Sequence, residues 1–180
     1  NIQNVRGDNY LKTHKLMETS SLISNDSLLL SNLDLNWNLD NSNLNTAFKI
    51  YEDLSRNYHD RYQYIFPDFN FYKKIAIPDS YNGQFDFNSY GYNKLYDTNV
   101  SESVLTNDFI FSSNNFINNN GISTNYDMLI KNSNNYSNNS LNYDGHLNYD
   151  LFGILKVDAR YPLLKRSENS INYLTPILSF

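Results

Sequence analysis

Apolar and polar residues alternate with a period of two along much of this chain. The alternation is clearest between residues 33 and 39, where the apolar positions are Leu33, Leu35, Trp37 and Leu39. A period of two places these side chains on one face of an extended strand and the polar side chains on the other. The turn-forming run Asp40–Asn43 follows, and residues 44–50 resume the alternation, so we predict a β-hairpin here.

The next segments interrupt this pattern twice. The apolar phase shifts across Pro67–Asp68, which predicts a bulge or a strand break, because proline cannot donate a hydrogen bond to a β-ladder. After a loop around residues 78–83, the aromatic positions predict a second phase slip just before Tyr90 and Tyr92.

Three further strands are predicted, from Leu105 to Phe111, over residues 122–130 and over residues 151–161. Residues 132–148 are polar and contain a glycine, which predicts a long loop between the last two strands. No segment of comparable length carries an apolar stripe with a period of 3.6 residues. We therefore predict an all-β fold of consecutive antiparallel strands in up-and-down order.

Segments of about ten residues with alternating faces are typical of transmembrane outer-membrane β-barrels, although soluble β-sandwiches alternate in a similar way. Asn, Asp and Lys in the middle of the predicted strands favour the barrel, because a water-filled lumen accepts them. We expect residues 1–180 to be one partial barrel domain, truncated at both ends. The chain begins at Asn1 without an initiator methionine and ends at Phe180 within an alternating segment.

Composition narrows the classes of function. The formal net charge is -5 and the charges of both signs are mixed along the chain, so no basic stripe suggests a nucleic-acid partner. The absence of cysteine excludes a thiolate nucleophile, a disulfide framework and a cysteine-based metal site. No run of about eighteen apolar residues is present, which excludes a spanning helix but not spanning strands.

Few residues suggest chemistry. His14, His59 and His146 fall in no spaced metal signature, and we expect them in loops or at strand ends. Glu52 and Asp53 are adjacent, so on a strand they would point to opposite faces. Because the chain has neither a GxSxG elbow nor a glycine-rich phosphate loop, we expect no catalytic residue, no metal site and no cofactor, and therefore no enzyme.

Four basic residues are candidates for contact with anionic lipid phosphates, namely Arg56, Arg61, Lys73 and Lys74. A guanidinium or ammonium group pairs well with phosphate. A short cluster of charges specifies little, however, and we interpret these four as ordinary charges at the rim of the sheet.

Four short motifs resemble, in order, the barrel of the lipopolysaccharide-assembly protein LptD family, also called OstA or Imp. The first comprises Asp8–Lys12, Ser20–Leu22 and Phe48–Leu54, and the others are Tyr64–Phe71, Asp150–Leu163 and Tyr173–Phe180. The sequence departs from the family around Gly153, where a proline is frequent, and residues 80–145 carry no family motif beyond the strand pattern.

The resemblance implies a wall segment of the outer-membrane translocon that inserts lipopolysaccharide into the outer leaflet of a Gram-negative bacterium. The partners it implies are lipopolysaccharide, outer-membrane lipid, an LptE-like lipoprotein plug and the periplasmic Lpt bridge proteins. Two alternatives stay open: another outer-membrane barrel, such as a porin or receptor, and a secreted soluble β-sheet module for binding or adhesion. A soluble module must cover its apolar faces with a second layer, whereas a barrel leaves them to lipid.

Overall fold

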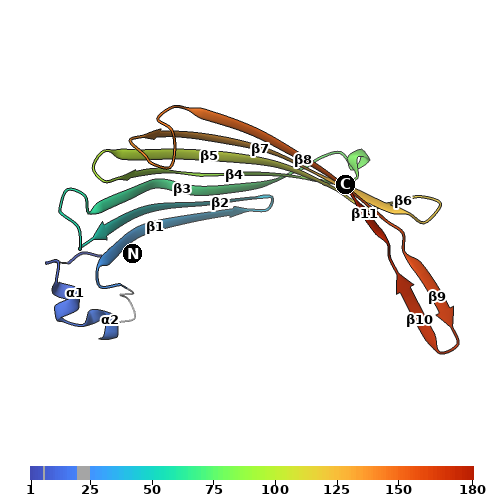
Figure 1. Cartoon of the computed structure of the whole chain (residues 1–180), viewed down its shortest axis with the longest axis horizontal. Helices are drawn as coiled ribbons and strands as arrows, with labels where there is room; N and C mark the ends of the chain where they lie inside the picture. Colours follow the sequence, from blue (N-terminus) through green and yellow to red (C-terminus); the bar gives the residue numbers. More distant parts are fainter. Residues whose placement is uncertain (6, 20–24) are drawn as a thin grey trace.

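The computed structural model describes residues 1–5, 7–19 and 25–180, and Ser20–Leu22 of the first family-like motif lie outside this part. Long antiparallel strands form one curved sheet (Figure 1). Its strands are β1 (Leu28–Leu39), β2 (Ser42–Asp53), β3 (Tyr62–Ile75), β4 (Gly83–Tyr96), β5 (Val100–Ser113), β6 (Phe116–Ile117), β7 (Ser123–Asn138), β8 (Asn148–Arg160) and β11 (Ile177–Ser179). The prediction of an all-β fold is confirmed.

The strand order is β1-β2-β3-β4-β5-β7-β8-β11, with β6 beside β7, and every pair is antiparallel. The predicted up-and-down order is confirmed for the long strands from β1 to β8, since consecutive long strands are neighbours in the sheet, whereas β11 pairs with β8 after the β9–β10 hairpin. The sheet is open, and within the described part of the chain β1 and β11 do not pair with each other. A separate two-stranded sheet contains β9 (Leu163–Ser167) and β10 (Ser170–Leu174).

Short helices and connections define the two ends of the sheet (Figure 1). The helix end carries α1 (Tyr10–Thr13), α2 (Leu16–Thr19) and the connections 54–61, 97–99 and 139–147. The hairpin end carries the turn 40–41, the connections 76–82 and 114–122 and the β9–β10 hairpin. The 3-10 helix η1 (Asp79–Tyr81) lies within the connection 76–82, where the sequence predicts a loop.

The first hairpin and the first irregularity agree with the sequence. β1 and β2 pair from Leu28↔Asp53 to Leu39↔Ser42, so the turn is two residues long and shorter than the predicted run. The register of β3 against β4 shifts between Ile65 and Asp68, which confirms the predicted bulge at Pro67–Asp68. Because of the bulge, Phe66 and Phe69 lie on the same face of the sheet although they are three residues apart.

The second predicted phase slip is wrong. β4 pairs with β5 without a break from Gly83↔Ser113 to Tyr96↔Val100, so Tyr90 and Tyr92 point away from Phe85 and Phe87. The alternation continues through Ser89 and Gly91, whose small size hides it from a search for apolar residues.

The predicted loop over residues 132–148 is also partly wrong, because β7 continues to Asn138 and only residues 139–147 connect it to β8. Residues 132–138 are polar on both faces, so their sequence shows no alternation. Pairing with β5 and β8 nevertheless holds them in the sheet, from Asn132↔Asn107 onward. Tertiary context overrides the local pattern at this position.

The two faces of the sheet differ in chemistry. We name one surface the apolar face. It holds the odd-numbered residues of β1, β4, β5 and β8 and the even-numbered residues of β2 and β7. In β3 it holds even-numbered residues before the bulge and odd-numbered residues after it. One row of paired residues across this face is Phe85, Phe111, Met128 and Leu155. The opposite surface, which we name the polar face, carries Asp86, Asp108, Lys131 and Asp158.

Among the described residues, one small cluster of buried apolar side chains lies at the helix end. Leu11 of α1 packs with Leu29 and Leu54, and Val5 and Leu16 flank them. Residues 1–3 lie along the outer edge of β1, where the backbone groups of Asn1 and Asn32 exchange two hydrogen bonds of 2.9 Å. The N-terminal segment therefore covers part of this edge, which would otherwise present unpaired backbone groups.

Candidate functional site

Burial is inverted relative to that of a soluble β-sheet. Among the described residues of the sheet, the polar face contains the most enclosed side chains, including Glu102 with 2% exposure and Asp158 with 3%. Large side chains of the apolar face are open, such as Trp37 at 65% and Leu155 at 64%. Curvature of the sheet crowds the side chains of one face and spreads those of the other, and the crowded face is the polar one.

Ion pairs and hydrogen bonds link the enclosed charges of the polar face to neighbouring side chains. The Lys131 ammonium lies 3.0 Å from Oδ1 of Asp108 and donates to the Tyr90 hydroxyl at 3.0 Å. Lys49 pairs with Asp68 in the same way across β2 and β3. The two ion pairs join strands that are adjacent in the sheet, whereas the hydrogen bond from Lys131 to Tyr90 reaches from β7 across β5 to β4.

A third carboxylate lies at the hairpin end of β8. Asp158 Oδ2 lies 2.7 Å from the Lys156 ammonium and 3.8 Å from the Arg160 guanidinium, and Oδ1 accepts from the hydroxyl of Ser179 on β11. Asp158 therefore links the last long strand to the short strand at the edge of the sheet.

The connection 139–147 folds back onto the polar face, where Glu102 anchors it. Oε1 of Glu102 accepts hydrogen bonds from the Ser140 hydroxyl at 2.6 Å, the Asn142 amide at 3.0 Å and the Tyr96 hydroxyl at 2.8 Å. The Ser137 hydroxyl also lies 2.9 Å from the carbonyl oxygen of Tyr143. This connection is therefore fixed against the sheet and does not project freely from the helix end.

Aromatic rings form two series on the apolar face. Tyr62, Tyr64, Phe66 and Phe48 follow one another with ring centroids 5.9 to 6.1 Å apart. Phe71, Phe87, Phe109 and Phe85 form the second series, with centroids 4.9 to 6.4 Å apart. Offset aromatic contacts at these distances stabilise neighbouring strands. The charged side chains of Glu52 and Lys73 occur on this face only near the ends of the strands.

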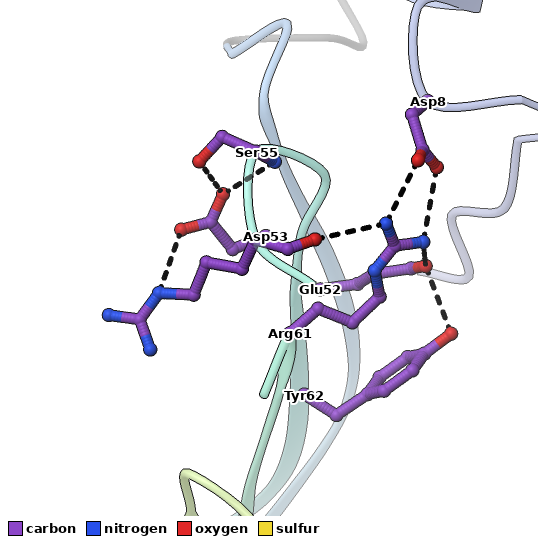
Figure 2. A network of polar contacts seen from close by, with 7 residues as sticks. Asp8, Glu52, Asp53, Ser55, Arg61 and Tyr62 are labelled. Atoms are coloured by element: carbon purple, nitrogen blue, oxygen red, sulfur yellow. Dashed lines mark hydrogen bonds and ion pairs between the residues drawn. The ribbon is translucent and has the colours of Figure 1, made fainter. Parts of the chain in front are cut away.

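Figure 2 shows a polar network at the helix end that is centred on Arg61. The guanidinium donates two hydrogen bonds to the carboxylate of Asp8, at 3.1 and 3.0 Å, and lies 3.4 Å from Glu52 Oε1. Glu52 also accepts from the Tyr62 hydroxyl at 2.9 Å. The hydrogen bond from Arg61 lowers the pKa of Asp8, and the same contact raises the pKa of Arg61. Arg61 thus fastens the N-terminal segment to the start of β3.

The side chain of Asp53 joins this network through Arg56, whose carbonyl oxygen accepts from the Arg61 guanidinium at 3.3 Å (Figure 2). Its Oδ1 accepts from the backbone N–H and the hydroxyl of Ser55, and its Oδ2 lies 3.4 Å from Arg56 Nε. Arg56 also pairs with Asp97 in the turn between β4 and β5. Glu52 and Asp53 are consecutive residues of β2 and therefore lie on opposite faces of the strand, as the sequence predicts.

The four basic candidates for lipid phosphates do not form one cluster. Arg56 and Arg61 lie at the helix end, whereas Lys73 and Lys74 lie near the opposite end of β3. A cavity of about 230 Å³ lies beside Arg56 and Arg61, but its other charged lining residues are Lys94, Asp53, Asp60 and Asp97. Because carboxylates already neutralise both guanidinium groups, this cavity does not have the character of an anion site.

The histidines lie apart from one another. His14 ends α1 and its ring lies 4.5 Å from that of Tyr10, whereas His59 and His146 occupy connections at the helix end. In the described ranges, no group of three His, Cys, Asp or Glu side chains is placed to hold a metal ion. None of the helices in these ranges is long and apolar enough to cross a membrane.

Sequence reasoning did not identify Glu102, Asp108 and Asp158 as enclosed groups. The alternation of polar and apolar residues assigns each to a face, but burial on that face depends on curvature, which the local pattern does not contain. No model of a known protein family matches the chain, and no curated protein matches its sequence.

Proposed function

We propose that this chain forms part of the wall of an outer-membrane β-barrel, with its polar face toward a water-filled lumen and its apolar face toward lipid. The inverted burial carries the proposal, because enclosed carboxylates and exposed aromatic and aliphatic side chains lie on opposite faces of one sheet. A barrel interior is polar, while its exterior meets hydrocarbon.

A soluble β-sheet requires a second layer over its apolar face, since exposing so many large apolar side chains to water is unfavourable. Within the described part of the chain, packing against the apolar face is limited to the small cluster of Leu11, Leu29 and Leu54. This observation favours the membrane wall over the secreted binding module. It does not separate one class of barrel from another.

The transported molecule is inferred from the sequence motifs. We propose lipopolysaccharide as the transported molecule and an LptD-like role in its assembly at the outer leaflet, because four short motifs occur in the order of that family. An LptE-like plug and the periplasmic Lpt bridge proteins are the corresponding partners. In this role the chain acts by shape and surface polarity and catalyses no reaction.

Membrane fractionation of the natural protein tests the barrel, followed by gel electrophoresis in detergent with and without heating. We expect recovery in the outer membrane and a mobility that changes on heating, since barrels stay folded in detergent until heated. Recovery in a soluble fraction would contradict the barrel. Depletion of the protein then tests the cargo, and unchanged surface lipopolysaccharide after depletion would contradict the transport role while leaving the barrel intact.

A further inference from the structure

The apolar face is not uniformly apolar, and its polar residues follow a pattern across the strands. Two adjacent rows of paired residues carry this pattern. The first row, nearer the hairpin end, is Leu39, Ser42, Lys73, Phe87, Phe109, Ile130 and Gly153. The second row, one step toward the helix end, is Trp37, Leu44, Phe71, Ser89, Asn107, Asn132 and Leu151.

The two rows exchange polarity between β3 and β4. On β2 and β3 the first row is polar and the second is apolar, whereas on β4, β5 and β7 the first row is apolar and the second is polar. The polar residues of the second row contact one another: the Ser89 hydroxyl lies 2.8 Å from Asn107 Oδ1, and the Asn107 amide donates to Asn132 at 3.3 Å. The strands β1 and β8 do not follow this exchange of polarity, because Leu39 of β1 in the first row and Leu151 of β8 in the second row are both apolar.

The pattern continues beyond these rows. Toward the helix end, β2 and β3 remain apolar at Phe48, Ile50 and Phe69, whereas β4, β5 and β7 carry further polar residues at Asn93, Ser103 and Asn134. Leu105 and Leu95 interrupt this second region. The apolar zone thus lies nearer the helix end on β2 and β3 and nearer the hairpin end on β4, β5 and β7.

From this oblique zone we infer the direction in which the bilayer crosses this sheet: the helix-end halves of β4, β5 and β7 project out of the hydrocarbon into water, while β2 and β3 stay covered there. The inference rests on the proposed barrel wall. The strands of membrane barrels are tilted by about 40° from the barrel axis. A plane parallel to the membrane therefore crosses each successive strand about one residue further along than the strand before it. Four steps from β2 to β7 correspond to about four residues, or about two rows of one face, which is enough to exchange the polarity of adjacent rows.

This placement explains why the polar side chains of Ser89, Asn107 and Asn132 can stand on the apolar face. Amide and hydroxyl groups are costly in hydrocarbon even when they hydrogen-bond with one another, and the Asn107 amide has more donors and acceptors than its bonds to Ser89 and Asn132 use. Placed above the hydrocarbon, the remaining groups bind water or lipid headgroups. The occupant of the apolar zone is bilayer hydrocarbon, and that of the projecting surface is the aqueous layer at the membrane.

Four single cysteine variants test the angle, because the chain contains no other cysteine. L44C and N132C share the second row, and S42C and I130C share the first. Each variant is treated with a charged, membrane-impermeant maleimide in purified outer-membrane vesicles opened to both sides. We expect N132C and S42C to be labelled at least about ten-fold faster than L44C and I130C, since a charged reagent enters hydrocarbon poorly. The heat-dependent gel shift verifies folding, and labelling after unfolding verifies that every thiol can react.

The outcomes separate the inference from the proposed function. If L44C and N132C react alike, and S42C and I130C react alike at a different rate, the hydrocarbon boundary does not shift between β2 and β7 as inferred. The inference is then wrong, while the protected row still shows that lipid covers the apolar face. Protection of all four thiols likewise contradicts the projecting surface alone. If all four react as fast as in the unfolded chain, no hydrocarbon covers the apolar face, and both proposals fall.

Discussion

At the scale of single residues, the Lys131 ammonium of the polar face has partners that come from two other strands. Asp108 on β5 and Lys131 on β7 are directly opposite in the register, and the ammonium also reaches Tyr90 on β4. One side chain therefore joins three strands. Removing a partner from an enclosed charge is costly because the remaining group has lost its hydration without compensation.

The variant K131M tests this contribution. It preserves the length of the side chain but leaves the Asp108 carboxylate without its cation, and we expect the free energy of unfolding to fall by about 1–3 kcal/mol. K165M is the matched control, since Lys165 is exposed on β9. Denaturant titration of both variants in detergent or vesicles measures the difference. Equal stability of K131M and the unmodified chain would show that the ion pair contributes nothing.

Acid should release the N-terminal segment from the sheet. Arg61 lowers the pKa of Asp8 below its ordinary value of 3.8, so their ion pair is complete above about pH 4 and is lost as the pH falls through the lowered pKa. The protection factor of the Thr13 amide, whose N–H donates to the carbonyl oxygen of Asn9 in α1, measures the docking of the segment, and we expect this protection to fall in that acidic range. D8N should exchange rapidly already at neutral pH, whereas D79N, at the other end of the sheet, should behave as the unmodified chain. A D8N profile identical to that of the unmodified chain would exclude this ion pair as the fastening contact.

At the scale of elements, close approach of the backbones fixes the β4–β5 pair. A Cβ atom at Gly91 would lie 2.1 Å from the carbonyl oxygen of Val104, whereas at Gly153 the nearest atom is 3.9 Å away. Both glycines lie on the apolar face of a strand, so they form a matched pair. Position 91 therefore requires glycine, because a Cβ atom there would collide with the backbone of Val104.

G91A should therefore weaken the sheet and G153A should not. We expect G91A to lower the free energy of unfolding by about 1–3 kcal/mol, because the backbones of β4 and β5 must separate to admit the methyl group. G153A should be neutral or slightly stabilising, since alanine restricts the unfolded chain more than glycine does. Urea unfolding of the two variants measures both values, and equal effects would contradict the close approach at Gly91.

Some of the strands and one irregularity could be predicted from the sequence, and others could not. Alternation identifies the strands around Trp37, Phe71 and Met128, and Pro67 identifies the bulge, because each leaves a local signal. Small or polar residues on both faces conceal the continuation of β4 through Gly91 and of β7 through Asn134. Pairing with two neighbours holds these segments, and such long-range contacts leave no periodic trace in the sequence. The predicted separation of Glu52 and Asp53 follows from strand geometry alone.

At the scale of the whole molecule, the sheet has one polar face, one apolar face and an open edge on each side. Curvature encloses the polar face, and the apolar face stays exposed over most of its area. The sequence predicts which residues share a face, but the enclosure of Glu102, Asp108 and Asp158 requires the curved sheet. These properties suit a segment of wall that meets lipid on one side and water on the other.

Fluorescence of Trp37 tests the central claim most directly, because the chain has a single tryptophan and it lies exposed on the apolar face of β1. The chain is folded into vesicles whose acyl chains carry bromine, a short-range quencher of tryptophan. The account predicts strong quenching relative to vesicles of unbrominated lipid, and weak quenching by iodide from the aqueous side. Efficient quenching by iodide with no effect of bromine, in chain that co-sediments with the vesicles and shows the β-sheet circular dichroism spectrum, would contradict contact between the apolar face and lipid.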